Sequence, residues 1–83
     1  MKNFKGDIIF TQDITLPSEM EPNGLAAVKE LKFEYSDVVD CRVGIGKEWF
    51  NYYMLSKGTS MDYIRVKFED MRRLYTEGIV KIK

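Results

Sequence analysis

Three stretches of this sequence alternate apolar and polar residues with a period of two, which constrains the fold more than any other feature. In the first, DIIFTQDITL at 7–16, Ile8, Phe10, Ile14 and Leu16 share one parity. Successive side chains of a strand point to opposite faces, so this period is typical of a half-buried strand. We predict a single strand over residues 7–16.

The second and third stretches predict two more strands with one apolar face each. Residues 38–45 place Val39, Cys41, Val43 and Ile45 on one side. Residues 63–68, YIRVKF, alternate apolar with basic side chains in the same way. Gly44 and Gly46 follow the second strand and indicate a turn.

The C-terminal segment predicts a short helix and a closing strand. In EDMRRLYTEG, Met71, Leu74 and Tyr75 have the i, i+3, i+4 spacing of one helix face. Gly78 fits the residue after a helix end, where a left-handed backbone is common. IVKIK then reads as a strand.

Between the first two strands the pattern is less regular. Residues 17–24 hold both prolines and predict a loop. We expect a helix over about 24–30 and a strand over about 31–35. Ser36 and Asp37 then predict a two-residue hairpin turn into the strand at 38–45.

Together these elements predict an α+β fold: a small, mostly antiparallel sheet of five or six strands with one or two short helices on one face. With 83 residues there is room for one domain, 1–83, and one core. The expected core residues are Ile8, Phe10, Ile14, Val39, Val43, Ile64, Val66, Phe68 and Leu74.

Composition argues against most enzyme classes. Histidine is absent and Cys41 is the only cysteine, so the usual general base, zinc ligands and catalytic triads are missing. We predict a non-enzymatic protein without cofactor or metal. A lone cysteine that shares a face with Val39 and Val43 predicts a buried thiol and a reducing compartment. No apolar leader or membrane span is present, so we expect a cytoplasmic protein.

Two short motifs with chemical precedent are incomplete. GIGK at 44–47 resembles part of a phosphate-binding loop, but the next residue is Glu48, where that motif requires Ser or Thr. The carboxylates of Asp7 with Asp13, and of Glu69 with Asp70, lack the glycine and asparagine rhythm of a calcium loop. Solvated surface charge explains both pairs.

The densest aromatic stretch, GKEWFNYYML at 46–55, carries the main functional prediction. As a strand over 48–55, the segment would have Trp49 and Tyr53 on one face and Phe50 and Tyr52 on the other, and as a helix its aromatic side chains would cover most of the circumference. Such a strand is central between two layers, or exposes tyrosine hydroxyls at a core edge, or uses one face as an interface. Tyrosine and tryptophan are enriched in interfaces. We therefore expect these four residues to bind another protein or a second copy of the chain, as in a homodimer.

Charge supports an alternative partner. The net charge is zero, but residues 1–41 hold four lysines and eight acids, and residues 42–83 hold nine basic residues and five acids. A patch formed by Arg65, Lys67, Arg72 and Arg73 would bind nucleic acid. Lysine outnumbers arginine nine to four, which suggests an AT-rich genome. The sequence thus favours a small protein-binding module, such as an inhibitor or regulator from a phage or mobile element of a low-GC bacterium, with a nucleic-acid-binding accessory protein as the alternative.

Overall fold

A long antiparallel ribbon, folded over on itself, forms the first half of the chain in the computed structural model, which describes residues 4–19, 28–58 and 61–83. Its near part pairs β1 (Gly6–Phe10) with β4 (Val38–Val43), and its far part pairs β2 (Ile14–Pro17) with β3 (Glu30–Phe33). The paired residue numbers add up to 47 in both parts, as in Gly6 with Cys41 and Leu16 with Leu31. One register therefore runs through the whole ribbon.

The ribbon folds over at a corner formed by residues 11–13 and 34–37. Here the backbone N–H of Thr11 donates to the carbonyl of Ile79 at 2.8 Å, outside the ribbon, and Ser36 adopts a left-handed φ of 66°. The prediction of one strand over 7–16 is therefore wrong: the ladder is interrupted, and its two ends enter different sheets. Asp37 does close a turn onto Glu34, but β3 and β4 do not pair, so the predicted hairpin at Ser36 and Asp37 is also wrong.

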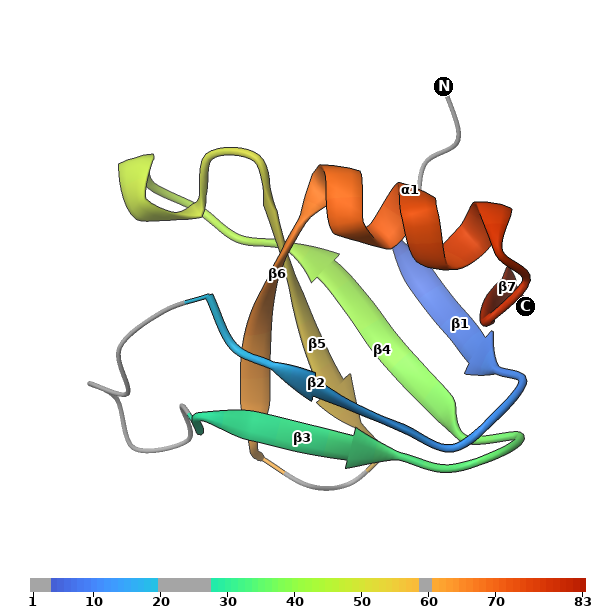
Figure 1. Cartoon of the computed structure of the whole chain (residues 1–83). Helices are drawn as coiled ribbons and strands as arrows, with labels where there is room; N and C mark the ends of the chain where they lie inside the picture. The colour runs from blue at the N-terminus through green and yellow to red at the C-terminus, as the bar shows by residue number, and fades with distance from the viewer. Residues whose placement is uncertain (1–3, 20–27, 59–60) are drawn as a thin grey trace.

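The remaining strands complete a five-stranded antiparallel sheet of order β6-β5-β4-β1-β7. Its further members are β5 (Tyr52–Lys57), β6 (Tyr63–Lys67) and β7 (Val80–Ile82). Figure 1 shows helix α1 (Phe68–Thr76) and the folded-over β2–β3 pair lying across the same face of this sheet. The predicted α+β class, an antiparallel sheet with a short helix on one face, is confirmed.

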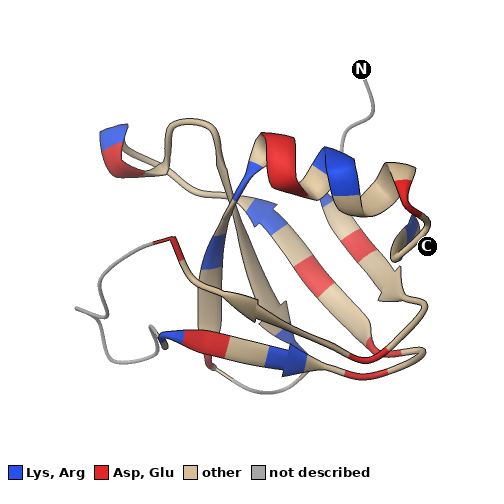
Figure 2. Cartoon of the chain, viewed as in Figure 1, with Lys and Arg blue, Asp and Glu red and all other residues tan. Residues whose placement is uncertain are grey.

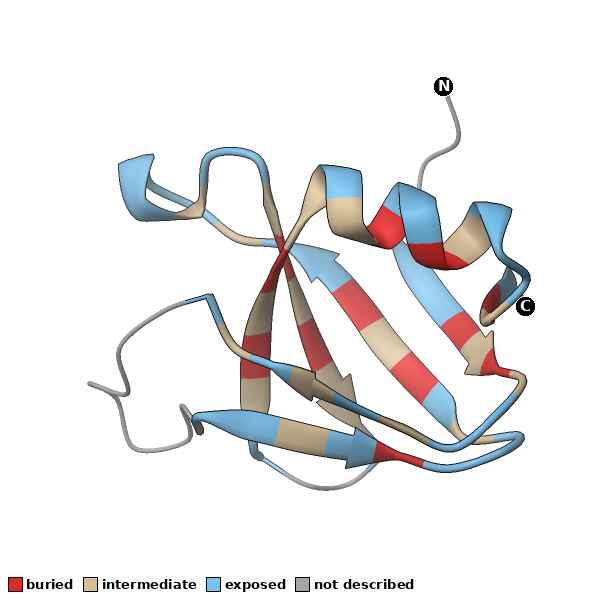
Figure 3. Ribbon diagram, in the orientation of Figure 1, coloured by how far each residue is buried: buried red, intermediate tan, exposed pale blue. Residues whose placement is uncertain are grey.

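One continuous core fills the space under the helix and the β2–β3 pair. Figure 3 shows buried positions alternating with less buried ones along β4, β5 and β6. The rings of Phe10 and Phe33 stack 4.3 Å apart and 2° from parallel, which joins β1 to the folded-over β3. The fully or nearly fully buried apolar residues are Phe4, Ile8, Phe10, Phe33, Val39, Cys41, Tyr53, Leu55, Ile64, Val66, Met71, Leu74 and Val80.

Three expected core residues are less buried than the alternation predicts. Val43 is 44% exposed and ends β4, so the strand predicted to continue to residue 45 stops early and leaves Ile45 92% exposed. Ile14 and Phe68 are half-buried and pack against the edge of the core. The pattern identifies the apolar face correctly, but it does not show where the sheet runs out of covering elements.

The C-terminal helix is confirmed, with Met71 and Leu74 as its buried stripe. Gly78 has a φ of 80° and donates its N–H to the carbonyl of Tyr75, while the N–H of Ile79 donates to Leu74. These two bonds form a Schellman motif, which ends the helix as the sequence predicts. In the described part of the chain, no helix is long and apolar enough to cross a membrane.

The helix predicted over about 24–30 lies mostly outside the described residues, because residues 20–27 are not described. Of its last three residues, Val28 and Lys29 are not helical, and Glu30 already begins β3.

The thiol of Cys41 is fully buried, as predicted. Burial, reinforced by the charge of Asp40, raises its pKa from an ordinary 9.0 to about 12. Above pH 9 the unfolded chain therefore releases this proton while the folded chain keeps it. Between these two pKa values only the folded state binds the proton. The free energy of unfolding therefore falls as the pH rises through this range.

We expect the free energy of unfolding to fall less between pH 9 and about 12 in Cys41→Ala than in the wild type. The slope due to the thiol approaches about 1.4 kcal/mol per pH unit where only the unfolded state is deprotonated. Urea unfolding of both proteins at several pH values measures it. Cys41→Ala removes the titrating group, so comparing slopes separates ionisation from the cavity that the variant creates. Equal slopes would contradict the expectation.

Candidate functional site

A tight turn at residues 50–52, which we call the arch, carries the most exposed aromatic side chain near the helix. The predicted strand over 48–55 divides here into a short 3-10 helix (Lys47–Trp49) and β5. Asn51, between them, has a left-handed φ of 67°, which asparagine tolerates better than most residues. Its carbonyl accepts the N–H of Phe68 at 2.8 Å, tying the arch to the start of α1. Phe50 is left 74% exposed on this fixed turn.

The arch and the first turn of α1 enclose a hollow of about 480 Å³, which we call the groove. Tyr52 and Lys67 are partners in the β5–β6 register, so the end of the aromatic stretch meets the basic strand-helix junction here. Figure 2 shows basic and acidic positions together along the start of the helix. The groove is lined by Phe50, Asn51, Tyr52, Lys67, Phe68, Glu69 and Arg72.

The four predicted aromatic residues have different environments. Tyr53 is only 6% exposed and packs edge-on against Phe4 and 4.4 Å from the ring of Phe68, so it belongs to the core. Burial raises its pKa, although a backbone hydrogen bond from Phe4 opposes the shift. Trp49 is half-buried, 6.1 Å from Tyr63. Only Phe50 and Tyr52 line the groove.

The position of Trp49 explains why the first residue of GIGK, Gly44, is a glycine. A Cβ added to Gly44 would lie 2.3 Å from the ring of Trp49, closer than any side chain allows. Gly44 is thus required for close packing of the indole on the backbone.

The four predicted nucleic-acid-binding residues have different surroundings. Lys67 and Arg72 line the groove, whereas Arg73 lies 3.5 Å from Asp70 in an ion pair beside a smaller hollow. Arg65 contacts another side chain of the protein: its guanidinium lies 4.1 Å from the centre of the Tyr52 ring.

The hydrogen bonds of Arg65 show that it holds loops together. Its Nη2 donates to the carbonyl of Glu19 at 2.6 Å, and its Nη1 donates to the carbonyl of Glu48. Together with the Tyr52 contact, these bonds link two loops to β5 and β6. Arg65 is therefore a structural clamp next to the groove.

The acidic residues that the sequence groups in pairs are separated. Asp13 lies at the corner, where it accepts the N–H of Tyr35 at 2.8 Å, while Asp7 lies on β1 opposite Asp40. Glu69 lines the groove and Asp70 faces Arg73. Among the described residues, no group of three or more Cys, Asp or Glu side chains is arranged to hold a metal ion.

Sequence reasoning missed Asn51, Phe68 and Glu69 as groove residues. An asparagine inside an aromatic run is a signal for a left-handed turn, and it would have divided the stretch at the correct place. Phe68 has no comparable signal, because its position depends on how the helix leaves β6. Comparison with known proteins gave no match to a family model, a curated protein or a solved structure.

Proposed function

We propose that the chain is a small non-enzymatic protein-binding module that uses the groove as its binding site. The observation that carries this proposal is the ring of Phe50, 74% exposed on an arch that is hydrogen-bonded to α1. An aromatic ring on a rigid turn offers apolar area at a low cost in conformational entropy. Binding hot spots are typically such anchors in the centre of an interface.

The charges of the groove support a particular kind of partner. Lys67 and Arg72 contribute two positive charges and Glu69 one negative charge around the aromatic walls. A partner segment with an apolar side chain next to a carboxylate complements this arrangement, because opposite charges favour encounter and correct register. An inhibitor or regulator needs only such a surface. The lone, buried thiol of Cys41 supports action in a reducing compartment, the cytoplasm.

Nucleic-acid binding is the second candidate, since Lys67 and Arg72 lie beside the ring of Phe50. Aromatic rings stack on bases while basic side chains neutralise phosphates. Glu69 in the same groove opposes a phosphate, and Arg65 and Arg73 are engaged elsewhere. A gel shift with single-stranded and double-stranded probes tests this candidate. Binding that is lost in Arg72→Glu would favour it over the protein partner.

We expect Phe50→Ala to weaken binding of the protein partner at least about tenfold, roughly 1.4 kcal/mol, with an unchanged melting temperature. The ring is mostly exposed, so the folded chain loses little when it is removed. Partners captured from the native host with the tagged wild-type chain would be purified and titrated against each variant.

Met61→Ala is the matched control, because Met61 is 79% exposed and lies outside the groove lining. Equal affinity of Phe50→Ala, Met61→Ala and the wild type would contradict the proposed binding site. A large fall in the melting temperature of Phe50→Ala would instead identify this ring as structural.

A further inference from the structure

The corner of the ribbon presents a second exposed aromatic ring, far from the groove. Tyr35 is 70% exposed at the tip of the turn between β3 and β4. Figure 1 shows this turn at the opposite end of the molecule from the arch at the start of α1. The ring therefore cannot reach the groove of its own chain.

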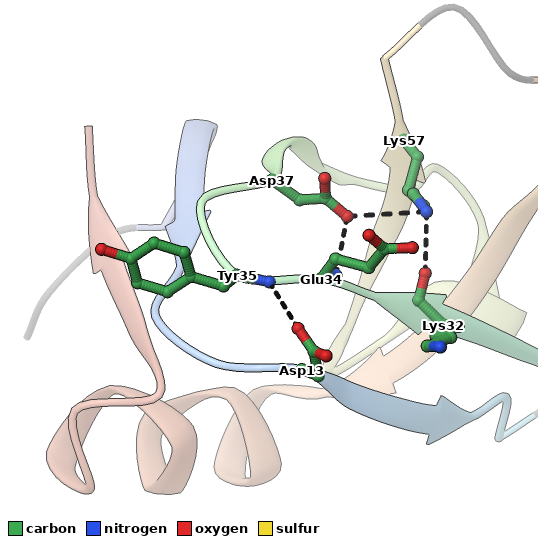
Figure 4. A network of polar contacts seen from close by, with 6 residues as sticks. All are labelled: Asp13, Lys32, Glu34, Tyr35, Asp37 and Lys57. Atoms are coloured by element: carbon green, nitrogen blue, oxygen red, sulfur yellow. Dashed lines mark hydrogen bonds and ion pairs between the residues drawn. The ribbon is translucent and has the colours of Figure 1, made fainter.

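A network of hydrogen bonds fixes the backbone that carries Tyr35. Its N–H donates to Oδ1 of Asp13 at 2.8 Å, and the N–H of Glu34 donates to Oδ2 of Asp37 at 2.7 Å. Lys57 Nζ lies 3.5 Å from the same Asp37 oxygen and donates to the carbonyl of Lys32 at 2.9 Å. Figure 4 shows the ring of Tyr35 pointing away from this network. The network holds the backbone in place and leaves the ring outside.

The corner is also acidic. Asp13 and Glu34 are exposed beside the backbone of Tyr35, on the network side of its ring, and within the described residues no ion pair is formed by either. Lys57 offsets the charge of Asp37 only. Figure 2 shows the acidic positions gathered on both strands of the corner. The corner thus carries an exposed aromatic ring, which we call the knob, on a hydrogen-bonded backbone beside two carboxylates that take part in no described ion pair.

We infer that the corner of one molecule docks into the groove of a second copy, an inference that rests on the proposed function of the groove. Tyr35 would pack against Phe50 and Tyr52, with Asp13 and Glu34 toward Lys67 and Arg72. The two surfaces match in chemistry: an aromatic ring with carboxylates meets aromatic walls with an excess of one positive charge. Hydrogen bonds hold the backbone of both surfaces before contact, which limits the backbone entropy lost on association.

The contact is head-to-tail, because it joins two different surfaces of the same chain. Heterologous contacts close into rings or continue as open chains, according to the rotation between neighbours. One knob in one groove buries a small area, so association is weak and depends on concentration. Exposed charges contribute, so salt weakens it.

Complementation between two defective variants tests the inference. Tyr35→Ala lacks the knob and keeps the groove, whereas Arg72→Glu reverses a groove charge and keeps the knob. In sedimentation equilibrium over rising concentrations, we expect the wild type to self-associate and each variant alone to weaken self-association at least tenfold. Mixed in equal amounts, the variants should form a one-to-one dimer and stop there, because only one intact contact remains.

Lys81→Glu is the charge control, since Lys81 is exposed on β7 outside both surfaces, and it should associate like the wild type. Circular dichroism confirms that each variant is folded, and Lys67→Glu replaces Arg72→Glu if the latter is destabilised. A monomeric wild type, variants that associate normally, or monomeric variants that fail to form the mixed dimer would each overturn the inference. The proposed function fails separately, when Phe50→Ala keeps full affinity for a captured partner.

Discussion

Replacing Phe10 with Ala is expected to lower the free energy of unfolding by about 3–5 kcal/mol. The ring is fully buried and stacks on Phe33 across the fold of the ribbon. Its loss therefore removes apolar burial and leaves a cavity where the five-stranded sheet meets the β2–β3 pair. Small domains have total free energies of unfolding of about 5–15 kcal/mol, so this substitution removes a large part of the stability of the fold.

Urea denaturation followed by circular dichroism measures the effect, provided that enough folded protein remains in water. Ile45→Ala is the control for a large apolar residue, since Ile45 is 92% exposed, and it should change stability by less than about 0.5 kcal/mol. A loss below 1 kcal/mol for Phe10→Ala would mean that the stack with Phe33 does not hold the folded ribbon together.

Local periodicity was sufficient to predict which side chains of each strand face the core. Ile8, Val39, Ile64 and Val66 are buried as the alternation predicts, because side-chain parity depends only on neighbours within the strand. Parity even survives the corner, since one register continues through both parts of the ribbon.

The corner itself was not predictable from local pattern. Thr11 extends the pairing of β1 with β7, because its N–H donates to Ile79, a residue that is 68 positions away in the sequence, and the ribbon bends directly after it. The hydroxyl of Thr11 bonds to the same carbonyl at 3.1 Å. A threonine in an alternating stretch reads as an ordinary strand residue, so the sequence contains no local sign of this long-range contact.

Residue type alone also failed to separate core from surface in the aromatic stretch. Tyr53 and Phe50 are three residues apart and similar in character, yet one is 6% exposed and the other 74%. The left-handed turn at Asn51 decides between them, because it places Phe50 before the strand and Tyr53 inside it. For the basic residues, the use of Arg65 depended on loops that meet only in the folded chain.

We expect the second large effect at Arg65. Arg65→Met should lower the free energy of unfolding by about 3 kcal/mol. The guanidinium donates to two backbone carbonyls, on the loops at Glu19 and Glu48, and hydrogen bonds from charged donors contribute about 1.5–3 kcal/mol each. Methionine retains much of the apolar stem but donates to neither carbonyl. The cation–π contact with Tyr52 is lost as well.

Arg65→Lys separates geometry from charge. Lysine keeps the positive charge, but its ammonium is compact and lacks the planar fork that reaches two carbonyls in different directions. We therefore expect the free energy of unfolding of Arg65→Lys to lie between those of the wild type and Arg65→Met, as measured by urea denaturation at low and high salt. If Arg65 served mainly as a free surface charge, Arg65→Lys would match the wild type and Arg65→Met would cost almost nothing. That result would return Arg65 to the basic residues available for nucleic acid, whereas a graded loss of stability would confirm it as a clamp beside the groove.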